Sequence, residues 1–326
     1  MNKFQRYLKM ARVLKGYRLK QSKLTYMPIR LWIETTNHCN LRCTMCLNKS
    51  DKMGKRGFMA FPLFKKIIDE SKGSVHNVNL HHRGEPLMHD ELPKMIRYCR
   101  DNHIASQIHT NATLLTEKKT YEIINAGLNV ISFSVDGYDK KSYESIRIGA
   151  CYEETLENIR RFLVIRKQIK KSTPYTIVEV IDFFQDEASK KKIIKKFETI
   201  KPDKLIIKKA HNWGGGYQPA PGVKASLPNA DTRFSCTFPW YALTIFWDGT
   251  VVICPQDFLG QSKVGDLKND TLKDIWNSQI QISYRKKIKK MKYNEITSCR
   301  ACDRPRRPQF FGIPTSHLGA FLKDNF

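Results

Sequence analysis

The sequence predicts an α/β protein made of a partial (β/α)6 barrel followed by a small α+β domain. From residue 30 onward, short runs of β-branched residues alternate with stretches of helical periodicity. This order requires parallel strands that are joined by right-handed crossovers. Six strands are too few for a closed eight-stranded barrel, so we expect a curved sheet that is open on one side. After residue 222 the composition changes, and four cysteines follow.

The strand and helix boundaries follow from the same alternation. The six candidate strands cover 30–36, 75–80, 104–110, 129–135, 176–183 and 204–209. The five candidate helices lie near 61–72, 90–102, 116–126, 153–170 and 186–199. The Gly- and Pro-rich residues 213–222 predict a flexible crossing to the second domain. There we expect a hairpin over 242–253 with an Asp-Gly turn, and a helix around 271–279.

The bulk composition is that of an ordinary globular chain of 326 residues, 41% of them apolar. No apolar run reaches the roughly 20 residues that a membrane span needs. The N-terminus lacks the apolar segment of a signal peptide, because Lys or Arg recurs every few residues. Nine cysteines in a chain of this length favour reduced thiols and metal ligation over a disulfide framework. We therefore expect a cytoplasmic protein.

The net charge of +26 favours anionic partners. Lysine is spread along the whole chain, so a generally solvated protein surface explains the charge as well as a dedicated binding surface does. Nucleic acid is not the expected partner. A small-molecule substrate, with an anionic one as an option, is expected instead. Residues 1–27 form a basic arm whose apolar residues recur at helical spacing. This arm predicts either peripheral membrane contact or a helix packed across the bottom of the barrel.

Three closely spaced thiols follow the first candidate strand, at Cys39, Cys43 and Cys46. As thiolates they can hold three irons of a [4Fe–4S] cluster and leave the fourth iron open for a small molecule. The alternative is a tetrahedral zinc site with His38 as the fourth ligand.

The run around these thiols resembles the cluster loop of the radical S-adenosylmethionine (radical SAM) superfamily. The resemblance implies a partial TIM-like barrel in which SAM chelates the open iron. One electron, from a donor such as flavodoxin or ferredoxin, then cleaves SAM to methionine and a 5′-deoxyadenosyl radical. Met45 stands where the family usually has an aromatic residue. Its flexible apolar side chain can still cover the adenine.

Other strand ends carry motifs that resemble the SAM-binding motifs of the same family. One of them departs from the family pattern, because Arg83 replaces the first glycine of Gly-Gly-Glu-Pro. The resemblance implies that the SAM-binding residues, besides Met45, are Gly84, Glu85, Pro86, Thr110, Asn111, Ser134, Asp136 and Arg147.

The four cysteines of the second domain suffice for one fully ligated [4Fe–4S] cluster, and a zinc ribbon is the alternative. They are Cys236, Cys254, Cys299 and Cys302. The module resembles the SPASM region of auxiliary-cluster radical SAM enzymes in its shortened "twitch" form. We therefore expect two [4Fe–4S] clusters and SAM as cofactors. The expected division is a basic arm (1–27), the partial barrel (28–222), the SPASM/twitch domain (223–305) and a C-terminal tail (306–326).

The resemblance implies abstraction of a hydrogen atom from unactivated carbon, a step that the cofactor supplies. We expect oxidation (dehydrogenation) of a small substrate such as a sugar or cyclitol alcohol, with the auxiliary cluster accepting the electron. A base must then take a proton. The first candidate is Asp257, three residues after Cys254, which resembles the acid found just after this cysteine in some related dehydrogenases, and Glu179 and His82 come after it. For each of the three, an ordinary salt-bridge or surface role is the more frequent alternative.

Two other functions stay open on the sequence. One is maturation of a peptide or protein by crosslinking, epimerisation or formylglycine formation. The expectation that no peptide-binding winged-helix domain precedes the barrel counts against it. The other is a non-catalytic module that binds zinc or nucleic acid.

Overall fold

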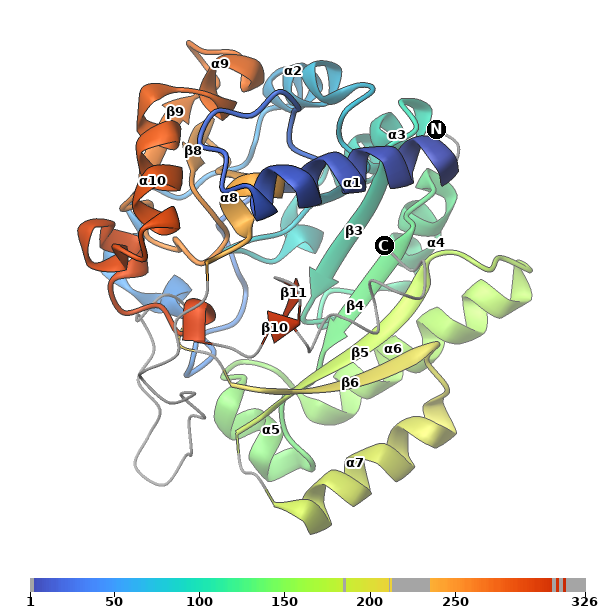
Figure 1. Cartoon of the computed structure of the whole chain (residues 1–326). Coiled ribbons are helices and arrows are strands. Elements are labelled where there is room, and N and C mark those ends of the chain that lie inside the picture. Colours follow the sequence, from blue (N-terminus) through green and yellow to red (C-terminus); the bar gives the residue numbers. More distant parts are fainter. Residues whose placement is uncertain are drawn as a thin grey trace.

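In the computed structural model, the residues described are 3–183, 186–210, 212, 235–306, 309–310 and 313–314. The predicted crossing over 213–222 and most of the predicted tail lie outside them. The described strands form one nine-stranded sheet in the order β6-β5-β4-β3-β2-β1-β7-β8-β9, and a two-stranded pair, β10-β11 (Figure 1). The predicted α/β class and partial barrel are confirmed.

The six barrel strands all pair in parallel, as the alternation of elements requires. They are β1 (Arg30–Ile33), β2 (Asn77–Asn79), β3 (Ala105–Thr110), β4 (Val130–Ser134), β5 (Tyr175–Asp182) and β6 (Lys204–Lys209). The helices between them are α2 (Phe61–Ser71), α3 (Leu92–Asp101), α4 (Glu117–Ala126), α5 (Lys140–Ile146), α6 (Tyr152–Gln168) and α7 (Glu187–Ile200). Helix α5 was not predicted, because it has only seven residues.

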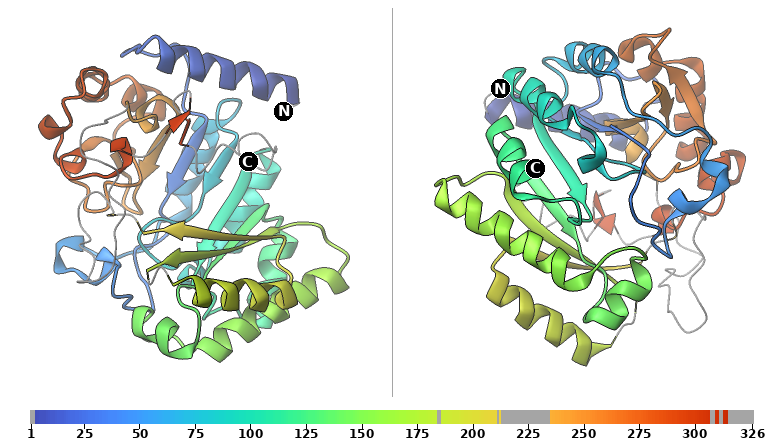
Figure 2. Two further views of the ribbon diagram at one scale, coloured as in Figure 1. Left: turned by 60° about the horizontal axis from the view of Figure 1, so that its bottom comes forward. Right: turned by 180° about the vertical axis from the view of Figure 1, so that it is seen from behind.

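The barrel helices lie on the outer side of the curved sheet (Figure 2). Alternate residues of β3 and β5 are buried, as expected for strands with one face under helices. On the outer face, Phe133 of β4 packs edge-on against Phe162 of α6, with ring centroids 5.4 Å apart. The inner face carries polar side chains, which places the candidate site inside the curve.

The C-terminal region continues the same sheet. Its first strand, β7 (Ala242–Ile245), pairs in parallel with β1, while β8 (Thr250–Val252) and β9 (Lys263–Asp266) follow as antiparallel neighbours. The Asp-Gly turn forms as expected: Gly249 adopts φ +92°, and Asp248 accepts a hydrogen bond from the backbone of Thr250. The remaining elements are α8 (Phe238–Tyr241), α9 (Leu272–Trp276), α10 (Gln279–Lys289), β10 (Gln309–Phe310) and β11 (Ile313–Pro314).

Helix α1 (Lys3–Arg18) crosses near the amino-terminal ends of the strands (Figure 1). Tyr17, at its end, is buried and donates a hydrogen bond to the carbonyl of Ser235, and its ring packs edge-on against Trp240. Leu8 and Leu14 are exposed. The middle of the helix also contacts the body of the protein, since Lys9 donates a hydrogen bond to the carbonyl of Gly73 and the Tyr26 hydroxyl donates one to that of Val13. Among the described residues, no helix combines the length and the apolarity that crossing a bilayer requires.

A buried guanidinium ties the N-terminal arm to the C-terminal region. Arg285 of α10 donates hydrogen bonds to the carbonyls of Ser22, Pro239 and Trp276, at 2.8–3.0 Å. Its guanidinium carbon lies 4.4 Å from the Trp276 ring centroid. Burial lowers the pKa of Arg285, to about 9, so the charge is held by carbonyl dipoles and the indole ring.

We expect Arg285→Met to lower the free energy of unfolding by about 3 kcal/mol, because it leaves buried carbonyls without donors. The exposed neighbour gives a matched control, since Lys286→Met should stay within about 0.5 kcal/mol of wild type. Urea unfolding of the anaerobically purified protein measures both. Equal losses in the two variants would contradict the role of this guanidinium.

Candidate active site and cluster-binding cysteines

The three-cysteine loop leaves β1 and is enclosed by apolar side chains. Leu41, Cys43 and Met45 form a buried cluster with Ile146 and Phe183, and Cys39 and Cys46 pack against it. The loop pairs with the segment after α5, since the backbone N–H groups of residues 42 and 44 donate to the carbonyls of residues 148 and 146. Met45 is buried in this cluster, and its contact with adenine stays a prediction.

Burial raises the thiol pKa values in this loop, to about 12 for Cys39 and about 11 for Cys46. The charge of Arg147 opposes the effect of burial at Cys43. Thiols of this kind stay protonated until a metal displaces the proton. The donor set of three converging thiols fits a cluster with one open corner.

Glu85, expected to bind SAM, is fully buried beside the loop. Its carboxylate accepts hydrogen bonds from Thr110 Oγ1 and from the backbone N–H of Asn111, at 2.7 and 2.8 Å. Burial raises the pKa of Glu85. The structure therefore brings together Glu85, Thr110 and Asn111, three of the predicted SAM-binding residues, and Pro86 follows directly at the start of a 3-10 helix.

Gly84 is required by a close approach of two backbone segments. A Cβ atom there would lie 2.4 Å from the carbonyl oxygens of both Thr36 and His38. The His38 carbonyl also accepts a hydrogen bond from the N–H of Glu85, at 2.8 Å. The segment that carries Glu85 is thus held directly against the start of the cysteine loop.

Asp136 and Arg147, also predicted SAM ligands, form a buried ion pair. The Arg147 guanidinium donates to Asp136 Oδ2 at 2.5 and 3.0 Å, and Asp136 Oδ1 accepts from the N–H of Ile181. Ser134 lies at the end of β4, where Glu179 of β5 is its register partner. The contacts of these residues with SAM stay predictions.

The structure brings the four C-terminal cysteines together as well. Burial, followed by the charges of the other three thiolates, raises the pKa of Cys254 well above its ordinary value. Cys236, Cys254 and Cys302 are buried, and Cys299 is half-buried. The backbone N–H of Cys236 donates to the hydroxyl of Tyr293 at 2.9 Å. Four converging thiols fit a fully ligated cluster.

A single zinc ion, the alternative at each cysteine group, requires closely spaced ligand atoms. A tetrahedral zinc bound by thiolates at about 2.3 Å holds its ligand sulfurs about 3.8 Å apart. Within the described part of the chain, only Glu144, Cys151 and Glu153 bring three ligand atoms within 4.8 Å of one another. Neither cysteine group brings three of its sulfur atoms that close together.

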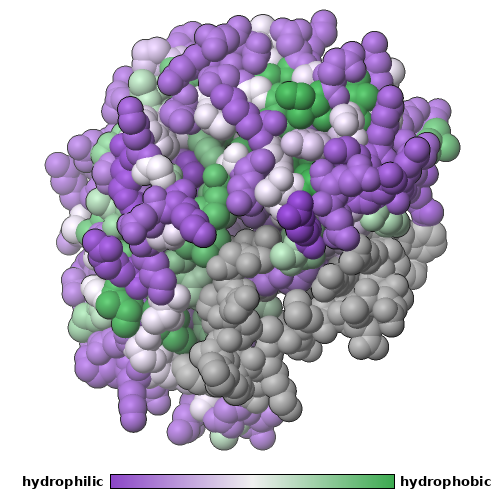
Figure 3. Space-filling view, turned by 90° about the vertical axis from the view of Figure 1, so that its left-hand side faces the viewer, coloured by the Kyte–Doolittle hydropathy of each residue, from purple (hydrophilic) through white to green (hydrophobic). Residues whose placement is uncertain are grey.

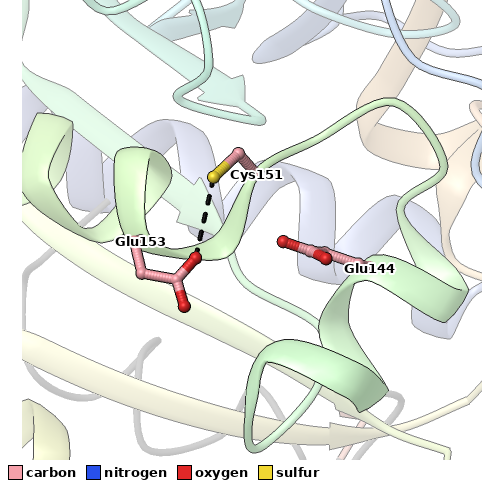
Figure 4. A group of neighbouring side chains, drawn as sticks. All are labelled: Glu144, Cys151 and Glu153. Atoms are coloured by element: carbon pink, nitrogen blue, oxygen red, sulfur yellow. Dashed lines mark hydrogen bonds between the residues drawn. The ribbon is translucent and has the colours of Figure 1, made fainter.

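The exception, Glu144, Cys151 and Glu153, is largely exposed, and its two carboxylates already contact a lysine. Figure 4 shows the Cys151 sulfur directed at Glu153, with Glu144 opposite. The ammonium of Lys140 lies 2.8 Å from a carboxylate oxygen of each glutamate and offsets one of their two negative charges. Cys99, the other cysteine outside the two groups, is buried in α3 as a small apolar residue.

Arg83, which replaces the expected glycine, joins the barrel to the C-terminal region. Its guanidinium forms two hydrogen bonds with the buried Glu34, at 2.5 and 2.7 Å, and lies 3.5 Å from the Phe246 ring centroid. Burial acts to raise the pKa of Glu34, but the hydrogen bonds from Arg83 and His82 outweigh it and lower that pKa. The sequence did not single out Glu34, because its partner is 49 residues away.

Two of the three candidate bases are engaged in structural contacts. His82 lies 3.5 Å from Glu34 through Nδ1 and 2.9 Å from the carbonyl of Pro255 through Nε2. Asp257 accepts hydrogen bonds from the N–H groups of Gln261 and Ser262, so it closes the loop beside the auxiliary cysteines. Glu179 lies on the inner face of the barrel instead, beside Lys208 and His109.

The basic stretch 284–292 belongs to α10 and the turn after it. There a hollow is lined by Ser22, Ser283, Lys286, Lys287, Lys289, Lys290, Lys292 and Glu295. Figure 3 views the molecule from the side of α10, and hydrophilic side chains cover most of the described part of that face. A role for this surface in binding an anionic partner stays a prediction.

Comparisons with known proteins agree with this geometry. Residues 33–178 match the family described as "Radical SAM superfamily", and residues 236–303 match SPASM, described as "Iron-sulfur cluster-binding domain". The tungsten-containing aldehyde ferredoxin oxidoreductase cofactor-modifying protein of Pyrococcus furiosus is 24% identical over 316 residues, which cover 84% of this chain and 88% of that protein.

Two solved structures share the fold at low identity. BtrN in complex with AdoMet and 2-DOIA is 19% identical, with a TM-score of 0.57 over 85% of this chain and 93% of that one. SuiB of Streptococcus suis bound to precursor peptide SuiA is 16% identical, with a TM-score of 0.66 over 95% of this chain and 78% of that one.

The sheet, the two cysteine groups and these matches define a class: a radical SAM enzyme with an auxiliary iron–sulfur domain. Residues 33–178 form a radical SAM domain, and residues 236–303 form a SPASM domain. These domains imply SAM and iron–sulfur clusters as its cofactors.

Replacement of Gly84 tests the contact between the Glu85 segment and the cysteine loop. We expect Gly84→Ala to displace the loop, because a methyl group cannot occupy a site 2.4 Å from two backbone oxygens. Anaerobic reconstitution should then yield less iron at the three-cysteine site, and 5′-deoxyadenosine formation under dithionite should fall at least tenfold. Wild-type iron content and rate would show that the segment can move without cost.

The buried ion pair between Glu34 and Arg83 allows a second test. We expect Arg83→Met to lower the free energy of unfolding by about 3–5 kcal/mol, because it leaves the Glu34 carboxylate buried without its partner. The double variant Glu34→Leu with Arg83→Met should lose about 2 kcal/mol or less, since no charge is then left unpaired. Urea unfolding measures both, and equal losses would contradict this account.

Proposed function

We propose that this radical SAM enzyme oxidises a small hydroxylated substrate by two electrons, with the four-cysteine cluster as electron acceptor. The observation that carries the proposal is the donor set of that second site. Four thiols would ligate all four irons of a [4Fe–4S] cluster, so no iron would be open to bind a ligand. Electron transfer is then the function that such a cluster can serve. BtrN, which shares the fold, was solved with AdoMet and the compound 2-DOIA.

The position of the second site supports this role. Because β7 pairs with β1, the C-terminal hairpin lies beside the strand that leads into the cysteine loop. Pro255, next to Cys254, accepts a contact from His82, which follows β2. The auxiliary cysteines therefore lie at the edge of the barrel interior, where a substrate radical could pass on its electron.

Within this proposal the chain's residues divide the work. When bound, SAM and the open-cornered cluster supply the 5′-deoxyadenosyl radical. Glu85, with Asn111 and Thr110, would hold the methionine ammonium, and Arg147 with Asp136 would hold the methionine carboxylate or the ribose. Cys236, Cys254, Cys299 and Cys302 would hold the acceptor. Burial of both groups keeps water from the radical.

A second candidate function is maturation of a peptide, for which the fold likeness to SuiB, solved with a precursor peptide, is the supporting observation. The relative from Pyrococcus furiosus is named for modifying a cofactor, which favours a small molecule.

Replacing one cysteine of each group separates the cleavage of SAM from the oxidation of the substrate. We expect Cys43→Ala to abolish 5′-deoxyadenosine formation under dithionite, because the SAM site needs three thiolates. Cys254→Ala should still form it but lose the oxidised product, and each variant should lose about half of the iron. Chemical iron analysis and mass spectrometry measure these outcomes.

The substrate class is tested with label transfer. Perdeuterated glycerol, glucose and myo-inositol are each incubated with the reduced enzyme and SAM. Deuterium in 5′-deoxyadenosine, measured by mass spectrometry, identifies the hydrogen donor. No transfer from any of them, together with transfer from a deuterated peptide, would replace the oxidation proposal by peptide maturation.

A further inference from the structure

A chain of polar side chains crosses the inner face of the barrel. Strand register places Arg30 of β1, Gln107 and His109 of β3, Glu179 of β5 and Lys208 of β6 on this face. The outer-face residues between them, such as Ile108 and Val178, are buried under the helices.

The hydrogen bonds among these side chains have a defined direction from donor to acceptor. Arg30 donates to Gln107 Oε1 at 3.4 Å, so the Gln107 amide nitrogen faces His109. That nitrogen lies 2.9 Å from His109 Nε2, which must accept because an amide nitrogen only donates. His109 therefore carries its proton on Nδ1, and Nδ1 lies 3.9 Å from Glu179 Oε2.

A second histidine is fixed in the opposite tautomer. His81 Nδ1 accepts a hydrogen bond from the backbone N–H of His109 at 3.1 Å, and the two rings stack with centroids 4.2 Å apart. Burial lowers the pKa of both imidazoles, and the charges of Lys208 and Arg30 lower that of His109 further, to about 3. Both rings are thus neutral.

Glu179 is held on one oxygen only. Lys208 Nζ lies 2.6 Å from Oε2, the same oxygen that His109 faces. Among the described residues, none forms a hydrogen bond with the other oxygen, Oε1. A carboxylate with one oxygen anchored and one open can accept a proton from a ligand.

The position of Glu179 is suitable for a reacting group. Its register partner on β4 is Ser134, one of the predicted SAM-binding residues. Two residues further along β5, on the same face, Ile181 packs against the apolar cluster around the cysteine loop. At about 3.3 Å per residue, Glu179 lies roughly 7 Å deeper in the barrel than that layer.

We propose that Glu179 Oε1 takes the hydroxyl proton of the substrate, and that Lys208, His109 and Gln107 are positioning residues for it. The inference rests on the proposed function. Glu179 would take the hydroxyl proton. SAM and the open-cornered cluster, when bound, would supply the radical that removes the hydrogen atom from the C–H carbon, and a cluster held by the four cysteines would accept the remaining electron. The C–O single bond becomes a carbonyl, so atoms and electrons balance.

Glu179→Gln tests the proton acceptor, with the polyol that passes deuterium to 5′-deoxyadenosine as the probe. We expect the oxidised product to fall by about 10²–10⁴-fold, the usual contribution of a general base. 5′-Deoxyadenosine formation should stay within about threefold of wild type. Glu157→Gln on the exposed face of α6 is the matched control and should leave both unchanged. Undiminished product from Glu179→Gln overturns the proposal.

The positioning chain is tested without any substrate. Nitrogen-15 NMR of the anaerobic protein with oxidised clusters should show His109 as the Nδ1–H tautomer and His81 as the Nε2–H tautomer. Gln107→Leu should shift the His109 tautomer ratio and leave His81 unchanged. If His109 of the wild-type protein is protonated on Nε2, the assigned direction of the hydrogen bonds is wrong. If no polyol passes label to 5′-deoxyadenosine and a deuterated peptide does, the proposed function fails, and the NMR measurement still tests the tautomers of His109 and His81.

Discussion

Strand β1 is the constraint on which the rest of the structure depends. It pairs in parallel with β2 on one side and with β7 on the other, so the barrel and the C-terminal region share one sheet. The cysteine loop leaves the carboxyl end of this strand. A cluster bound there is placed at once beside the Glu85 segment, the barrel interior and the hairpin that leads to the auxiliary cysteines. Parallel pairing is what brings these chain ends to one edge.

Two buried ion pairs lie at this edge of the sheet. Glu34 with Arg83 and Asp136 with Arg147 are buried pairs on either side of the cysteine loop. Such pairs contribute little net stability, because desolvation offsets their attraction, but they penalise any arrangement that separates the partners. This suits a site whose geometry must be maintained while the bound cofactors change charge.

The sequence predicted much of the fold through local patterns, and it singled out two groups of thiols that the structure brings together. Their role as cluster ligands stays a prediction. The helix expected over 116–126 followed from the alternation of strand and helix patterns, and the structure adds the reason for its ends: Thr116 caps its start, and Gly127 adopts the left-handed conformation at its end. The spacing of Cys39, Cys43 and Cys46 fits one loop because a few residues separate them. The base candidates were less informative: Asp257 and His82 lie in the expected neighbourhood, yet both are engaged in holding loops and domains together.

The sequence by itself thus determined the succession of strands and helices along the chain and the two groups of thiols. Alternating patterns and short spacings are properties of neighbouring residues. Only the tertiary structure decided that Arg83 reaches Glu34, that β7 joins β1, and that Glu179 faces His109 and Lys208. These contacts span tens to hundreds of residues and depend on strand register. A shift of one residue would turn each inner-face side chain outward, and no local pattern specifies that register across five strands.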